Sequence, residues 1–338
     1  MFNSWIAVKS PNFLLTCSNV TLAIVLPPSG TNIVTQLYDA LLKKQEKTSH
    51  IFEIRPINDR IFVPNKDGNM PELPEITSRA IEMNKELTGK TIQAFEVLQP
   101  KCLNVTPDEL NQFLNHSVID SVTHHGKWIM AHTTQGWLLI NLGMGGEILL
   151  VNRKQMPAKY KLVIDFTDQT CLAINFWWFG YVHFCALDGL TNHPMIAKLG
   201  PNVLDLSEEV FTNLIKNQKG KVKAFLLDQS RVAGIGNAYV HDILFMAKLH
   251  PNRLIASLSA TEISALFKGI QDGLRPSLTK GGAFYEMNLY GEKGGFQMED
   301  IIIGYRENTP CPQCGAPIQK IKTGSTSSFI CSTCQPES

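Results

Sequence analysis

The stretch Cys311-Pro-Gln-Cys314, followed after sixteen residues by Cys331-Ser-Thr-Cys334, decides the fold at the C-terminal end of this chain. A Cys-x-x-Cys turn brings two thiolates together, and two such turns saturate one zinc ion with four sulfur ligands. Because no coordination position stays open, the metal is predicted to be structural. Disulfides or chance pairs are the alternative, and they fit this spacing less well. The residues between the pairs predict a short β-hairpin, a ribbon of the kind that often holds nucleic acid.

The composition limits the class of protein. With 338 residues, 44% of them apolar, the chain can bury a sizeable core in two domains or a little more. The formal net charge of only +1 gives no overall positive field, so any surface for a polyanion must be local. The remaining cysteines are widely scattered, which favours reduced thiols in a cytoplasmic protein over a disulfide framework. No run of 18 apolar residues predicts a membrane span.

Residues 1–69 differ from the rest of the chain. The apolar run from Phe13 to Leu26 is interrupted by polar residues and lacks a small-residue cleavage site, so it makes a poor signal peptide. We interpret residues 1–69 as an extension outside the folded domains, disordered or not translated. On this interpretation, the functional protein begins at Met70.

From Met70 onward the pattern becomes regular. Pro74 suits the first turn of a helix, and Glu72 and Glu75 complement its N-terminus. Apolar residues then recur at helical spacing as far as Gly89, which supplies a stop. Residues 91–183 contain many short, closely spaced strands, and this predicts an antiparallel β-sandwich.

Beyond residue 200 the pattern becomes helical. Segments 222–229 and 238–248 are predicted helices, separated by a glycine-containing connection in which Asn237 occupies an N-cap position. Lysines and arginines within 216–253 outnumber the acidic residues by five. A glycine turn between helix ends can present amides to a phosphate, with these cations beside it. An ordinary helical hairpin with a solvated basic face explains the segment equally well.

Six motifs occur in a fixed order along the chain. They are Met70-Pro-Glu-Leu-Pro-Glu75, Gly126-Lys127, Leu142-Gly-Met-Gly-Gly146, Gly234-Ile-Gly-Asn-Ala-Tyr239, Leu289-Tyr-Gly291 and the four-cysteine ribbon. In this order, over residues 70–336, the chain resembles the formamidopyrimidine-DNA glycosylase and endonuclease VIII family.

The resemblance implies an α+β fold in three parts. These are an N-terminal β-sandwich domain with a leading catalytic helix at 70–190, a helix-two-turn-helix DNA-binding domain at 200–290, and a zinc-ribbon β-hairpin at 291–338. It also implies a bifunctional DNA glycosylase and AP lyase of base-excision repair, with one structural Zn²⁺. The expected partner is double-stranded DNA containing oxidised bases or abasic sites, bound by a monomer in the bacterial cytoplasm, at the nucleoid.

Matching residue by residue, the resemblance makes Pro71 the nucleophile, Glu72 the proton donor and Lys127 a catalytic lysine beside the abasic sugar. The secondary amine of an N-terminal proline attacks the sugar C1′ to form a Schiff base. An α-amino group titrates near pH ~8, so an unprotonated fraction exists at neutral pH. Without the other motifs, Pro71 and Glu72 would be ordinary helix N-terminal residues, and Lys127 a surface charge at a strand end.

The resemblance also implies residues that contact DNA or orient the site. Asn237 grips the phosphodiester and Lys223 adds charge there, while Glu75 orients the catalytic groups. Met144 fills the gap left by the extruded base, and Phe179 wedges against the opposite strand. Core packing is the alternative for each apolar member of this set.

Several departures from the family pattern are visible. The arginine that usually pairs with the orphaned base is replaced within Asn175-Phe-Trp-Trp-Phe-Gly180, where Trp177 and Trp178 stand instead. Thr326-Ser327-Ser328 replaces the arginine expected before the third cysteine. The segment 294–309 is longer than in the compact family version, and it resembles divergent endonuclease VIII-like branches. The lesion, the opposite base and the choice between β and β,δ elimination stay open.

A further departure concerns Pro71, whose nitrogen lies in a peptide bond unless the chain starts at Met70 and loses that methionine. Two alternatives therefore stay open beside the enzyme. One is a catalytically silent relative that binds damaged DNA. The other is an RNA-associated zinc-ribbon protein, because similar helical and ribbon elements occur in translation factors.

Overall fold

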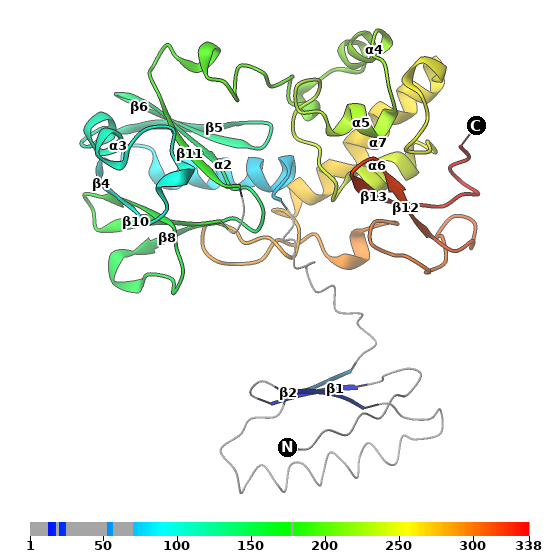
Figure 1. The fold of residues 1–338 in the computed structure, drawn as a ribbon, viewed down its shortest axis with the longest axis horizontal. Coiled ribbons are helices and arrows are strands. Elements are labelled where there is room, and N and C mark those ends of the chain that lie inside the picture. The colour runs from blue at the N-terminus through cyan, green and yellow to red at the C-terminus, as the bar shows by residue number, and fades with distance from the viewer. Residues whose placement is uncertain (1–12, 18–19, 25–52, 57–69, 177–178, 338) are drawn as a thin grey trace, which may run out of the picture. The chain divides into compact units, whose positions relative to one another are not determined.

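The computed structural model describes residues 13–17, 20–24, 53–56, 70–176 and 179–337 (Figure 1). They divide into two compact units, with the boundary between Lys66 and Asp67. In the first unit three short antiparallel strands form a sheet of order β2-β1-β3. The bounds are Phe13–Cys17 for β1, Val20–Ile24 for β2 and Glu53–Pro56 for β3. The other residues of the predicted extension lie outside the described residues, so its interpretation stays a prediction.

The second unit starts with helix α2 (Leu73–Leu87). Its start is a capping box in which the Glu72 amide donates to the Glu75 carboxylate, with Pro74 in the first turn. Beyond the helix, Gly89 has a φ of 84°, a left-handed conformation that suits glycine at a helix end. The apolar face of α2 packs into the β-sandwich core, but Leu73 belongs to the core of the helical half. The helix therefore joins both halves of this unit.

The predicted β-sandwich is confirmed. Its two four-stranded sheets have the orders β4-β9-β10-β8 and β11-β7-β6-β5, and every pairing is antiparallel (Figure 1). The strands are β4 (Ile92–Val97), β5 (Ile119–His125), β6 (Trp128–Thr133), β7 (Gly136–Asn141), β8 (Glu147–Asn152), β9 (Leu162–Phe166), β10 (Thr170–Asn175) and β11 (Tyr181–Cys185). A short helix, α3 (Pro107–Leu114), packs beside β4. Between the sheets lies a continuous apolar core.

The other half of the unit is helical, as predicted. Its helices are α4 (Glu208–Lys216), α5 (Val222–Leu227), α6 (Val240–Met246) and α7 (Ala260–Thr279). The N-cap of α6 is Tyr239, so the prediction that Asn237 caps this helix was wrong. The amides of Gly236 and Ala238 donate to the Glu72 carboxylate, and this interaction holds the preceding residues in a turn instead. No helix among the described residues is long and apolar enough to cross a bilayer.

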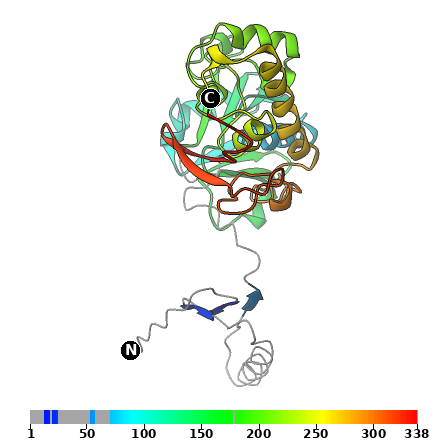
Figure 2. The ribbon, with the colours of Figure 1, turned by 90° about the vertical axis from the view of Figure 1, so that its right-hand side faces the viewer.

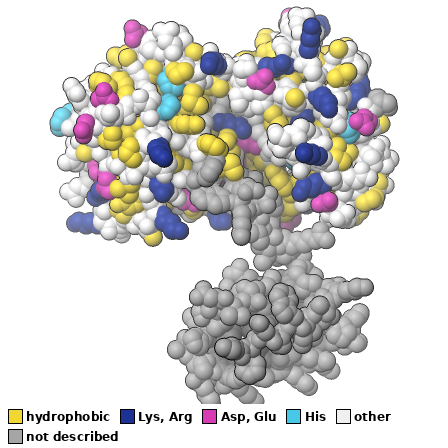
Figure 3. Space-filling model, viewed as in Figure 1, with side chains coloured by type: hydrophobic (Ala, Val, Ile, Leu, Met, Phe, Trp, Pro, Cys, Tyr) yellow, Lys and Arg dark blue, Asp and Glu magenta, His cyan; other side chains and the backbone are white. Residues whose placement is uncertain are grey.

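The predicted hairpin is present as strands β12 (Gln319–Thr323) and β13 (Thr326–Ile330), shown in red beside the helices in Figure 2. It packs on α6 through a small apolar core that includes Phe245, Ile303 and Phe329. The buried Asp242 carboxylate of α6 accepts three amides from residues 302–304, at 2.7–2.9 Å. These bonds fix the start of the zinc segment to the helical half. In the space-filling view, a notch separates the two halves of the unit (Figure 3).

Candidate active site

The start of helix α2 meets the turn before helix α6. The Leu73 amide donates to the Gly234 carbonyl at 3.0 Å. The carboxylate of Glu72 accepts the amides of Gly236 at 2.6 Å and Ala238 at 2.7 Å. Only 2% of Glu72 is exposed, so its carboxylate makes few hydrogen bonds to water. The two amides compensate for this loss of hydration. Folding therefore brings together two segments that lie far apart in the sequence.

Lys127 approaches the same point from the turn between β5 and β6. Gly126 has a φ of 55°, and its amide donates to Asn202 Oδ1 at 2.6 Å, which fixes the turn against the helical half. A Cβ atom on Gly236 would lie 2.3 Å from Glu72 Oε1 and 2.4 Å from Lys127 Nζ. The carboxyl and the ammonium therefore converge on a position that only glycine leaves free.

The environment of Glu72 changes its acidity. Burial raises the pKa of the Glu72 carboxyl to about 7, even though the Lys127 charge and the two amides act in the opposite direction. The neighbouring Glu75 carboxylate raises it further. A carboxyl with this pKa holds its proton for part of the time at neutral pH and can exchange it with a reacting group. The raised pKa of Glu72 thus suits the proton-donor role that the sequence predicted for it.

Glu75 lies beneath the site and is almost fully buried, with 3% exposed. Its carboxylate accepts the Glu72 amide at 2.9 Å and the Ala283 amide at 3.0 Å, and it also accepts the Tyr239 hydroxyl. The Tyr239 hydroxyl lies 2.6 Å from Ser277 Oγ on α7. These contacts favour an orienting role for Glu75 over direct contact with DNA.

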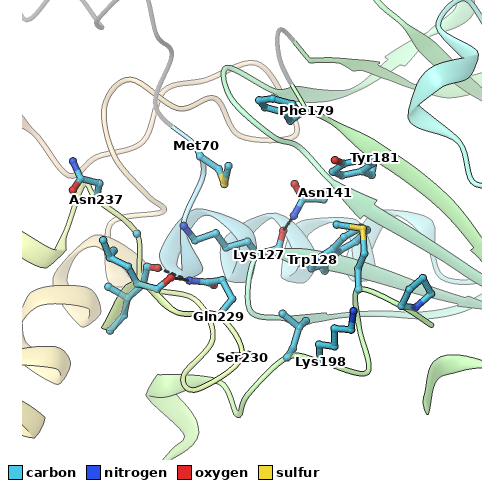
Figure 4. A pocket seen from close by; sticks show the side chains of 16 residues that line it. Met70, Lys127, Trp128, Asn141, Phe179, Tyr181, Lys198, Gln229, Ser230 and Asn237 are labelled. Atoms are coloured by element: carbon cyan, nitrogen blue, oxygen red, sulfur yellow. Dashed lines mark hydrogen bonds between the residues drawn. The ribbon is translucent and has the colours of Figure 1, made fainter. Parts of the chain in front are cut away.

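A cavity of about 790 Å³ opens beside Lys127 (Figure 4). Lys127, Phe179 and Asn237, three residues predicted from the sequence, line it together with Met70. The Oδ1 atom of Asn237 is buried and has no hydrogen-bond partner among the described groups, while a side-chain hydrogen bond joins Asn237 to Tyr305. Asn141 also lines the cavity; its Nδ2 donates to the Lys127 carbonyl at 3.1 Å, and its Oδ1 accepts the Gly143 amide at 3.0 Å.

Phe179 is held at the rim of this cavity in an unusual conformation. Its φ is 57°, and 63% of the residue is exposed. A Cβ atom on the next residue, Gly180, would lie 2.2 Å from the Phe176 ring, so the chain must turn sharply here. An exposed aromatic ring in a left-handed backbone conformation is a strained arrangement of the kind found at functional sites.

Comparisons with known proteins match both halves and the hairpin. The profile described as the formamidopyrimidine-DNA glycosylase N-terminal domain covers residues 70–175, and that of the H2TH domain covers residues 199–288. Formamidopyrimidine-DNA glycosylase from Legionella pneumophila is 32% identical over 277 residues, which cover 79% of this chain and 99% of the relative. The Pelobacter propionicus enzyme of the same name is 30% identical over 272 residues, with 79% and 100% covered.

The chain belongs to the formamidopyrimidine-DNA glycosylase family. Solved structures agree with this assignment. Lactococcus lactis Fpg in complex with DNA containing N7-benzyl-Fapy-dG matches with a TM-score of 0.73 and 27% identity, covering 79% of this chain and 100% of that one. The complex of the L. lactis protein with abasic-site DNA gives a TM-score of 0.72 at 26% identity, with the same coverage.

The third part of this family fold is the zinc finger, whose profile, described as found in FPG and IleRS, covers residues 309–336. The Sγ atoms of the four predicted ligands lie within 4.8 Å of one another. A tetrahedron of about 2.3 Å Zn–S bonds requires sulfurs about 3.8 Å apart, so the thiolates fit one zinc ion. The predicted structural zinc site, made by Cys311, Cys314, Cys331 and Cys334, is confirmed.

Not every predicted family residue lies at the cavity. Met144 is half-buried in the loop between β7 and β8 and is absent from the cavity lining. The Lys223 ammonium is buried under the zinc hairpin, where it donates to hairpin oxygens. Trp177 and Trp178, which stand where the family has arginine, lie outside the described residues. Asn141 escaped sequence reasoning, although its position directly before the Leu142–Gly146 motif was a usable signal.

Proposed function

We propose that this protein is a bifunctional DNA glycosylase and AP lyase that excises oxidised bases through a Schiff base on Pro71. The observation that carries the proposal is the convergence of Glu72 and Lys127 at Gly236, next to the residue that would supply the amine. The L. lactis relative, with the same fold, has been seen bound to DNA with Fapy, abasic and oxidised-pyrimidine lesions.

The chemistry follows from the positions of these groups. The neutral Pro71 nitrogen attacks C1′ of the damaged nucleotide, the bond from C1′ to O4′ breaks, and Glu72 donates its proton to O4′, which opens the sugar ring. The bond from C1′ to the base then breaks, and the base leaves with the proton of the Pro71 nitrogen as the iminium forms. Loss of a C2′ proton from the resulting iminium expels the 3′ phosphate and cleaves the strand. Hydrolysis of the imine then releases the enzyme, either directly or after a second elimination has expelled the 5′ phosphate.

The cavity supplies the remaining contacts in this proposal. Lys127 and the amides of Asn141 and Asn237 bind phosphates beside the reacting sugar. Phe179 wedges against the strand opposite the lesion. Outside the cavity lining, Met144 from the loop between β7 and β8 fills the space of the extruded base. The exposed ring of Phe179 and the unpartnered Oδ1 of Asn237 support these roles.

The same proposal requires that Pro71 become the N-terminal residue. In the described chain its nitrogen is joined to Met70, so it cannot act as a nucleophile there. The family profile begins at Met70, and 79% of this chain covers 98–100% of the relatives' lengths. We infer that translation from Met70, followed by removal of that methionine, gives the active form.

Borohydride trapping tests this function. A zinc-loaded chain that begins at Pro71 should form a covalent adduct with an abasic-site or oxidised-base duplex when the imine is reduced. The same chain with an acetylated Pro71 nitrogen, or with residues 1–70 attached, should form none. If the free-proline chain gives no adduct on any damaged duplex, the glycosylase-lyase proposal is wrong.

A second candidate rests on the Met70–Pro71 peptide bond itself. If the cellular protein retains this bond, the chain is a damaged-DNA-binding relative without lyase activity. Mass spectrometry of the N-terminus of the native protein separates the two candidates, because only the enzyme requires a mature chain that starts at Pro71.

Which oxidised base this protein excises depends on whether it belongs to the formamidopyrimidine-DNA glycosylase branch or to the endonuclease VIII-like branch of the family. The relatives named above carry the name formamidopyrimidine-DNA glycosylase, whereas the long segment 294–309 led to the prediction of an endonuclease VIII-like branch. Excision rates on matched duplexes carrying one oxidised purine or one oxidised pyrimidine, each opposite all four bases, test that prediction. A marked preference for oxidised purines would contradict it.

A further inference from the structure

The turn that carries Lys127, here named the lysine turn (residues 125–127), is attached to the helical half at two points. The Gly126 amide donates to Asn202 Oδ1 at 2.6 Å, and His125 Nε2 lies 2.8 Å from the Gly200 carbonyl oxygen. A carbonyl oxygen can only accept a hydrogen bond, so the Nε2 atom of His125 carries a proton. Both contacts end on one short segment of the helical half.

The orientation of the Asn202 side-chain amide is fixed from its other side. Its Nδ2 donates to Asp205 Oδ2 at 2.9 Å. Because a carboxylate accepts hydrogen bonds, this contact leaves Oδ1 of Asn202 facing the Gly126 amide. Gly126 is buried, so its amide needs an acceptor from the protein. A rotated Asn202 amide would instead bring two donors together.

Asn202 also connects the lysine turn with the segment that contacts the start of helix α2. It pairs with Ala233 in an isolated parallel bridge. The next residue, Gly234, accepts the Leu73 amide at 3.0 Å, directly beside Glu72. A short series of backbone contacts thus leads from the lysine turn through Asn202 to the proton donor.

We propose that Asn202 is a positioning residue that sets where the Lys127 ammonium lies relative to the Glu72 carboxyl. A lysine side chain is long and flexible, so the position of its ammonium depends on the backbone that carries it. Asn202 holds this backbone from the helical half, and Asn141 holds it from the β-sandwich, where its Nδ2 donates to the Lys127 carbonyl at 3.1 Å. The effect on catalysis rests on the proposed function, whereas the position of the ammonium does not involve DNA.

Asn202→Ala removes the acceptor of the Gly126 amide without changing the net charge. Single-turnover excision by the chain that begins at Pro71 should slow by about 10- to 100-fold, because a shift of about 1 Å in a catalytic group can cost this much. In a Lys127→Met background the same change should slow excision by no more than about twofold, since the lysine that Asn202 positions is already absent. Effects that multiply in the double variant would contradict the proposal.

Titration of the Glu72 carboxyl tests the position of the ammonium without DNA. The Lys127 charge lowers the pKa of this carboxyl, against the larger effect of burial, so a displaced ammonium should raise the pKa above its value of about 7. Asn202→Ala leaves in place the other titratable groups that interact with Glu72, namely Glu75, Tyr285, Glu286 and Tyr305. Carbon-13 NMR of the full-length chain, labelled at the glutamate carboxyl carbons and assigned with Glu72→Gln, measures the pKa.

The titration separates this proposal from the proposed function. An unchanged Glu72 pKa in Asn202→Ala would overturn the positioning role, whatever the activity of the enzyme. A raised pKa in a protein that forms no borohydride adduct would refute the glycosylase-lyase function and support the positioning of Lys127.

Asn111→Ala is the matched control. Asn111 is also half-buried, and its Oδ1 accepts the Phe95 amide at 2.8 Å, but it does not line the cavity. This variant should lower the melting temperature and leave both the excision rate and the Glu72 pKa unchanged. If the control raises the Glu72 pKa as well, lost stability explains the effect and the positioning role is wrong.

An exchange of two side chains tests the same contact with the fold retained. Asn202→Asp alone keeps an acceptor for the Gly126 amide, but it sets two carboxylates against each other and should slow excision. Adding Asp205→Asn restores a donor between the two positions and the original net charge, so the rate should return to within about twofold of that of the unaltered enzyme. If the exchange does not restore the rate, the contact with Asn202 does not position Lys127.

Discussion

The zinc hairpin and the start of helix α2 are both small polar sites at the edge of an apolar core, but they are assembled in opposite ways. The four sulfur ligands come from residues 311–334, one short segment held by one ion. Glu72, by contrast, is bound by amides 164 and 166 positions further along the chain, and Lys127 arrives from a third segment. The zinc site depends on its bound ion, whereas the site around Glu72 depends on how accurately the two halves of the unit pack. Different treatments should therefore disrupt the two sites.

Replacing the Glu72 proton donor should have the largest effect. Glu72→Gln should slow base excision by about 10²- to 10⁴-fold, the usual contribution of general acid catalysis, while affinity for abasic-site DNA changes by no more than about threefold. Single-turnover kinetics and anisotropy measure the two quantities. An excision rate within about threefold of the unaltered enzyme would remove Glu72 from the mechanism.

Two glycine substitutions compare the sites directly. Gly236→Ala should slow excision by about 100-fold, because the new methyl group would collide with Glu72 and Lys127 and displace both. Gly324→Ala places the same methyl group in open space at the hairpin turn, where φ is 62°. It should therefore cost only about 1 kcal/mol of hairpin stability and leave the excision rate of bound substrate unchanged. Equal losses of activity in the two variants would contradict the distinction between the sites.

Zinc removal should act on the hairpin alone. A strong chelator should unfold residues 309–336 and weaken DNA binding on the order of 100-fold, because the hairpin has too small a core without the ion and loses the contacts with DNA that its ribbon shape predicts. Hydrogen exchange of α2 and the β-sandwich should change little. Global unfolding on chelation, seen by circular dichroism, would show that the hairpin also supports the catalytic junction.

The pH dependence of the excision rate should follow the protonation of the Glu72 carboxyl. Since its pKa is raised from 4.5 to about 7, the carboxyl is protonated below pH 7, and the excision rate should fall as pH rises further, approaching tenfold per pH unit. The folded state also holds this proton between pH 4.5 and 7 while the unfolded chain releases it, so the Glu72 contribution to the free energy of unfolding decreases as pH rises through that range. In Glu72→Gln the residual rate should lack the decline above pH 7.

Sequence reasoning predicted elements with strong local signals and missed weaker ones. The α2 helix, with its capping residues and its stop at Gly89, was predictable because propensity and periodicity agree there. Strands β5 and β11 and helices α3 and α4 were not predicted as separate elements, although residues 91–183 were predicted to be rich in strands and the region beyond residue 200 to be helical. The cap at Asn237 was predicted wrongly, because the Glu72 carboxylate takes the amides around it.

By itself, the sequence determined the zinc site, the α+β class, the order of the parts and the candidate residues Pro71, Glu72 and Lys127. Cysteine spacing alone suffices for the zinc site, because each ligand pair lies within a few residues. The α+β class, the order of the parts and the three candidate residues came from the family resemblance, which six motifs in order carry. Only the tertiary structure decided that Glu72 and Lys127 meet at Gly236, that Glu72 has a pKa of about 7, and that Lys223 lies under the hairpin. Burial and long-range proximity arise when two cores pack against each other, and no local pattern encodes them.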